Sequence, residues 1–99
     1  MPKPIIDKAE VSIDLPNRFY HGSFGGSSNY DVKVDEVGVH IALDHRGEQP
    51  RHVAFHLHHY LFSGILEAIA NEITEKNALS DTDSVRLHEA ATKLAKALS

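Results

Sequence analysis

Four histidines occur within the eight residues HVAFHLHH, at positions 52, 56, 58 and 59. Neutral imidazole is a good ligand for zinc, copper and nickel, and it is also the side chain that gains or loses a proton near neutral pH. Such a segment can therefore hold a metal, move protons or face water. Which of these it does depends on which histidines are neighbours, and hence on the local secondary structure.

Residues 52–58 fit two secondary structures. In a helix, His52, His56 and His59 would form one polar stripe at positions i, i+4 and i+7. In a strand, side chains alternate between two faces, with Val53, Phe55 and Leu57 on one face and His52, Ala54, His56 and His58 on the other. We favour the strand, because the alternation continues without error from Arg51 to His58 and because valine and phenylalanine suit strands.

If residues 51–58 form a strand, a fifth histidine is expected on the same sheet face. YDVKV (30–34) and the segment that follows it alternate in the same way, and Asp35–Gly38 is a suitable loop between them, with Gly38 as its left-handed residue. The next hairpin would then place His40 directly opposite His56, with Cβ atoms about 5 Å apart. The candidate metal ligands on this outer face are His40, His56, His52 and His58.

This signal for a metal is not specific. The sequence contains neither an HExxH pattern nor a cysteine pair, and Lys33, beside His40 on the neighbouring strand, would oppose a cation. The outer face of a small antiparallel sheet also tolerates polar residues without any function. We therefore expect the histidines to face solvent, and the alternatives are zinc, copper or nickel binding and a contact surface that responds to pH.

The remaining periodicity predicts an α+β fold. AEVSIDL (9–15) alternates strictly and is typical of a half-buried strand, whereas residues 18–21 form a short strand or part of a connection. From about residue 59 to residue 76 the apolar period is helical, and a second helix begins at Ser80 or Asp81. We expect an antiparallel meander of about four strands followed by two C-terminal helices packed on one sheet face. The inner sheet face would carry Val11, Ile13, Val32, Val34, Val39, Ile41, Val53, Phe55 and Leu57.

Composition limits the class of protein. The 99 residues are 41% hydrophobic and 24% charged, which predicts one folded domain over residues 1–99, with residues 1–8 as a loose tail. The formal charge of −4 and the absence of a basic cluster argue against a nucleic-acid partner. No run approaches the roughly 18 apolar residues that cross a membrane. The lack of cysteine favours the cytoplasm.

The glycine-rich segment GSFGGSS (22–28) predicts a flexible loop. It matches neither the phosphate-binding loop nor the dinucleotide motif. Phe24 within it either packs against the core or is an exposed contact residue. Because no catalytic constellation is present, we expect no catalytic residues and no cofactor. A small enzyme would have to use a histidine as general acid or base, and His21 is the nearest to this loop.

The first helix suggests a partner, because its apolar residues span a wider arc than one packing surface requires. They are Leu61, Phe62, Ile65, Leu66, Ala68, Ile69, Ala70 and Ile73. A second copy of the chain would cover such a surface, and we expect a homodimer. The sequence thus predicts a small non-catalytic binding or regulatory module that acts through protein–protein contacts. The alternatives are a histidine-rich metal-binding domain and a small enzyme that uses one histidine.

Overall fold

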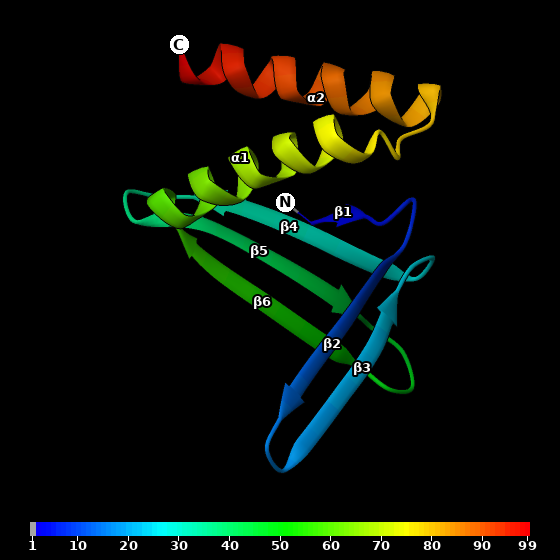
Figure 1. Cartoon of the computed structure of the whole chain (residues 1–99). Coiled ribbons are helices and arrows are strands. Elements are labelled where there is room, and N and C mark those ends of the chain that lie inside the picture. The colour runs from blue at the N-terminus through cyan, green and yellow to red at the C-terminus, as the bar shows by residue number, and fades with distance from the viewer. Residues whose placement is uncertain (1) are drawn as a thin grey trace. The chain divides into compact units, whose positions relative to one another are not determined.

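The computed structural model describes residues 2–99 and has an α+β fold, in which strands precede two C-terminal helices (Figure 1). The strands are β1 (Lys3–Pro4), β2 (Ala9–Leu15), β3 (Arg18–Phe24), β4 (Ser28–Val34), β5 (Gly38–His45) and β6 (Arg51–His58). The helices are α1 (His59–Lys76) and α2 (Asp81–Leu98). The chain divides into two compact units, the first extending to Ser63 and the second comprising Gly64–Ser99. The predicted fold class is confirmed.

The larger sheet has four antiparallel strands in the order β1-β4-β5-β6. Its registers are those that the alternation predicts, with Val34 opposite Val39 on β4 and β5, and Ile41 opposite Phe55 on β5 and β6. Residues 51–58 form a strand, so the helical alternative for the histidine segment is wrong. The polar faces of β5 and β6 therefore coincide.

The predicted meander is wrong in its first strand. β2 does not join the large sheet but pairs along its whole length with β3, from Ala9 opposite Phe24 to Leu15 opposite Arg18. Two residues, Pro16 and Asn17, remain to close this hairpin, and two-residue turns are the commonest hairpin connection. The fourth strand of the large sheet is instead β1, which lies in the segment expected to be a loose tail.

The glycine-rich segment is only partly a loop, because residues 22–24 belong to β3 and Ser28 begins β4, which leaves residues 25–27 as the connection. Phe24 is fully buried and Ser28 almost so, which excludes an exposed role for Phe24. Arg51 of β6 holds the hairpin in place: its guanidinium lies 5.3 Å from the centre of the Phe24 ring and its Nη2 donates to the Ser23 carbonyl at 2.6 Å. Val11 completes this small core from β2.

Gly38 is required by close packing of two strands and not, as predicted, by a left-handed backbone. Its backbone is not left-handed, since Gly47 and Asn77 are the residues with positive φ among residues 2–99. A Cβ at Gly38 would instead overlap the carbonyl oxygen of Leu57 and lie 2.9 Å from the Cα of His58. β5 and β6 therefore approach too closely at this point for any side chain.

The helices begin and end at recognisable signals. Ser80 caps α2, its Oγ accepting the N–H of Asp83 at 3.1 Å, as the sequence predicts. α1 ends at Lys76, followed by Asn77 with φ 45°, whose N–H donates to the Ile73 carbonyl. The two helices run in opposite directions (Figure 1). Within residues 2–99, neither combines the length and apolar character needed to cross a bilayer.

Candidate functional site

The histidines of β5 and β6 meet as the strand interpretation predicts. His40 and His56 are directly opposite in the register, and their rings stack with centroids 3.8 Å apart and planes 10° from parallel. His40 is half-buried and His56 is exposed. The pair therefore presents two imidazoles side by side on one face of the sheet.

Asp35, which the sequence pattern does not indicate as a ligand, joins this pair. Its Oδ2 lies 2.7 Å from Nε2 of His40, and its Oδ1 accepts the backbone N–H groups of Val37 and Gly38, both at 2.9 Å. The Gly38 N–H, then His40 and the Val37 N–H, hold the pKa of the Asp35 carboxyl well below its usual range. The carboxylate is thus charged and fixed beside the histidine pair.

His59 fastens the same loop to the start of α1. Its Nε2 lies 2.9 Å from the backbone oxygen of Asp35, and its backbone N–H donates to the Val37 carbonyl at 3.3 Å. The Asp35–Gly38 loop is therefore held at both its side chain and its backbone. Such support fixes the direction in which the Asp35 carboxylate points.

The other two candidate ligands are placed differently. The ring centroid of His58 lies 5.2 Å from that of His56, at an angle of 56°. His52 is opposite Asp44, with Nδ1 3.6 Å from Oδ1. Because His52 and His56 are four residues apart on one strand, their Cα atoms are separated by about 13 Å at roughly 3.3 Å per residue. The structure therefore brings together His40, His56 and Asp35, with His58 beside them and His52 apart.

A polar hollow runs along this face from the cluster. Its lining includes Lys33, Asp35 and His40 at one end and His52 at the other. Ala42, which is opposite Ala54 in the register, contributes to its lining. The small Ala42 side chain occupies little of the space between His40 and His52. The histidine face is thus a shallow, accessible surface.

His21, the histidine nearest to the glycine-rich segment, lies on the surface of the β2–β3 hairpin. It is exposed on β3, where its Nδ1 lies 2.9 Å from Oγ of Ser12 on the paired strand. A histidine general acid or base needs a second group and a substrate held in a defined position. At His21 the partner is the Ser12 hydroxyl on the paired strand.

The second unit carries a different kind of surface, an apolar groove between α1 and α2. Its lining includes Leu66, Ile69, Ala70 and Ile73 from α1 and Leu87, Ala91 and Leu94 from α2. Within His59–Lys76 and Asp81–Leu98 no residue is buried. Ile69 and Leu87, which line the groove, are each about half exposed, at 49% and 51%. The leucines and isoleucines that α1 and α2 contribute to this lining thus leave between 37% and 51% of their surface in contact with solvent.

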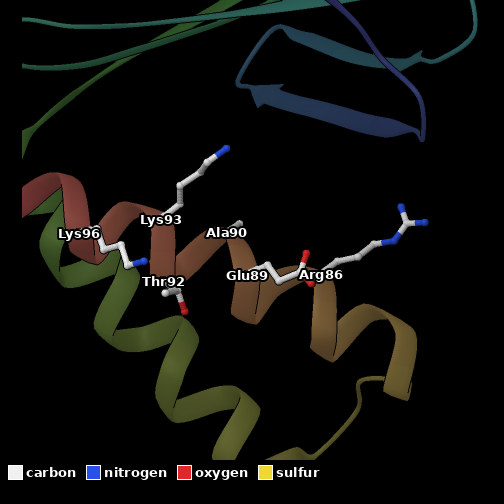
Figure 2. Close-up of a pocket in the computed structure, with 6 residues that line it drawn as sticks. All are labelled: Arg86, Glu89, Ala90, Thr92, Lys93 and Lys96. Atoms are coloured by element: carbon white, nitrogen blue, oxygen red, sulfur yellow. The ribbon is translucent and has the colours of Figure 1, made fainter.

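A basic patch adjoins this groove on α2. Figure 2 shows Arg86, Lys93 and Lys96 projecting from the helix, with Glu89 and Ala90 among them. Ala90 also lines the apolar groove, so the two surfaces are continuous. The groove is therefore bordered by positive charge along α2.

The chain matches no family model, and neither the curated proteins nor the solved structures contain a match to it. The site has to be interpreted from its own geometry.

Proposed function

We propose that the protein is a small non-catalytic binding module that acts through protein–protein contacts and works as a homodimer. The observation that carries this proposal is the exposed apolar groove of the second unit, in which neither helix buries a residue. Aliphatic side chains that stay partly exposed contribute less to folding than fully buried ones, and removal of their remaining surface from water on association is favourable. The absence of cysteine supports assigning the protein to the reducing cytoplasm.

The opposite charges of α1 and of the C-terminal part of α2 favour a second copy of the chain as the occupant of the groove. α1 carries three glutamates, Glu67, Glu72 and Glu75, against Lys76, a net charge of −2. The Arg86–Leu98 part of α2 carries three cations against Glu89, a net charge of +2. A two-fold axis can place α1 of each copy along α2 of the other, since such an interface is self-complementary. Apolar groove would then face apolar groove, bordered by opposite charges.

Sedimentation equilibrium of the full chain over a wide concentration range tests this proposal. A chain mass of 11.0 kDa predicts a dimer of about 22 kDa. Ile69→Lys places a charge in the groove and is expected to give a monomer. Val85→Lys is the matched control, because Val85 is 57% exposed but lies outside the groove lining, and this variant should remain dimeric. Circular dichroism of both variants shows whether the helices are retained.

Two results would contradict the proposal. One is a monomeric mass for the unmodified chain at every concentration. The other is equal dissociation of the Ile69→Lys and Val85→Lys variants with their helices intact, because the groove would then not be the interface. A different protein recovered in a stable complex with a monomeric chain would assign the groove to that partner.

A further inference from the structure

We propose that Asp35, His40 and His56 bind one divalent transition-metal ion, for which zinc is the representative, on the polar face of the sheet. This site lies in the first unit and is independent of the apolar groove of the second. The inference goes beyond the proposed function, because dimer formation by the helices requires no metal.

The three side chains converge closely enough for one ion. One ligand atom from each residue can be chosen so that all three lie within 4.8 Å of one another. Zinc bonds of about 2.0–2.2 Å place the ligands of a tetrahedral ion about 3.3 Å apart. Asp35 Oδ2 and His40 Nε2 are 2.7 Å apart, so these two atoms need to separate by about 0.6 Å or slightly more. The exposed His56 side chain can close the remaining gap by rotation.

The Asp35 carboxylate is already supported as a ligand. Its two backbone hydrogen bonds use Oδ1, which leaves Oδ2 directed at His40 and available to the ion. Carboxylates that bind metals are commonly held in position by hydrogen bonds of this kind. The loop therefore needs no rearrangement to present this oxygen.

The donor set decides the class of ion. Two imidazoles and one carboxylate suit zinc, nickel or copper, whereas calcium and magnesium prefer sites made of oxygen ligands. Three protein ligands leave the fourth tetrahedral position open to water or to an anion. The polar hollow beside the cluster, lined by Lys33 among others, gives access to that position.

Isothermal titration of the untagged full chain with zinc chloride, at neutral pH and after treatment with a chelator, tests the site. We expect one zinc per chain and no heat of binding from magnesium chloride. His40→Ala, His56→Ala and Asp35→Asn should each weaken zinc binding at least about tenfold, as loss of a ligand or its support does in other sites. His52→Ala is the matched control on the same strand and face, and its affinity should be unchanged.

Cobalt supplies a readout that a change in folding alone would not produce. Cobalt in a tetrahedral site with nitrogen and oxygen ligands absorbs visible light, and we expect this absorption in the unmodified chain and in His52→Ala but not in His56→Ala. His56 is exposed, so its removal should leave the fold intact. No zinc uptake by the unmodified chain would overturn the proposal. Zinc binding that is lost in His52→Ala or kept in both His56→Ala and Asp35→Asn would overturn it as well.

Discussion

His40 and His56 lie directly opposite each other on β5 and β6, and their rings stack 3.8 Å apart. This contact depends on the register of the two strands, because a slip of one residue would send the His56 side chain to the other face. The register is in turn set by the apolar pairs on the opposite face, such as Ile41 with Phe55. Cross-strand pairing on the apolar face thus positions the groups on the polar face.

Removal of the Lys33 charge should strengthen zinc binding. Lys33 is opposite His40 in the register of β4 and β5 and also lines the polar hollow. At the separation of cross-strand neighbours, a cation repels a divalent ion by an energy that solvent reduces to about 1 kcal/mol or less. Lys33→Gln is therefore expected to tighten zinc binding by about two- to fivefold in isothermal titration.

Lys8→Gln is the control for this prediction, because it removes the same charge from a residue outside the sheet, paired with Glu10 at 3.3 Å. Its zinc affinity should equal that of the unmodified chain. Equal effects of the two substitutions would show that only the total charge matters, and a weaker affinity in Lys33→Gln would contradict the placement of the ion.

Acidification should remove the contribution of Asp35 to stability. A carboxyl whose pKa is lower in the folded chain stabilises the fold above its unfolded pKa of about 3.9, and this stabilisation is lost as pH falls towards the folded value. Asp35→Asn keeps a side-chain oxygen for Val37 and Gly38 but has no charge. Urea unfolding should show Asp35→Asn less stable than the unmodified chain near neutral pH, with a difference that narrows as pH falls below about 4.

Asp14→Asn, at an exposed position of β2, controls for the loss of one negative charge. The difference in unfolding free energy between Asp14→Asn and the unmodified chain should not narrow in acid as the difference for Asp35→Asn is expected to. A difference between the unmodified chain and Asp35→Asn that stays constant down to the most acidic pH would mean that hydrogen bonding, and not charge, accounts for the effect.

The sequence predicted the parts of the fold that alternation controls and missed those that depend on tertiary pairing. Strict alternation in residues 30–58 determined three strands and their registers, because only one register places all apolar residues on one face. The alternation of β2 was equally clear, but alternation does not say which strand is the partner. The full length of β3 could not be predicted, because Gly22 and the glycines that follow it are typical of loops.

The candidate site was predicted in part for the same reason. The register of β5 and β6 is enough to predict that His40 lies opposite His56. To predict that Asp35 belongs to the same cluster, the backbone path of the Asp35–Gly38 loop must also be known. One local signal was available: an aspartate at the start of a short turn commonly accepts N–H groups two or three residues later. Asp35 does so with Val37 and Gly38, and this turn directs its second oxygen to His40.

Two glycine-to-alanine substitutions should change stability in opposite directions. At Gly38 the added methyl group would overlap the backbone of Leu57, so Gly38→Ala is expected to destabilise the fold by about 2–3 kcal/mol. At Gly64, within α1, a Cβ meets no atom within 4 Å, and Gly64→Ala should stabilise by about 0.5–1 kcal/mol. Urea unfolding of both variants measures these changes. Similar losses at the two positions would contradict the close approach of β5 and β6.

The dimer should be weakened by salt if the charges of α1 and α2 attract across its interface. With a formal charge of −4 per chain, general repulsion between two copies would have the opposite result, since salt would screen it and strengthen the dimer. Lys93→Glu changes the Arg86–Leu98 segment from a net charge of +2 to 0 and should raise the dimer dissociation constant about two- to fivefold at low salt. Lys3→Glu makes the same change of charge on β1, outside the helical unit. Sedimentation equilibrium at low and high sodium chloride separates these cases. If Lys93→Glu raises the dimer dissociation constant more than Lys3→Glu does, and this difference disappears at high salt, the result supports pairing of α1 with α2. Equal changes of the dissociation constant in both variants indicate repulsion between whole chains.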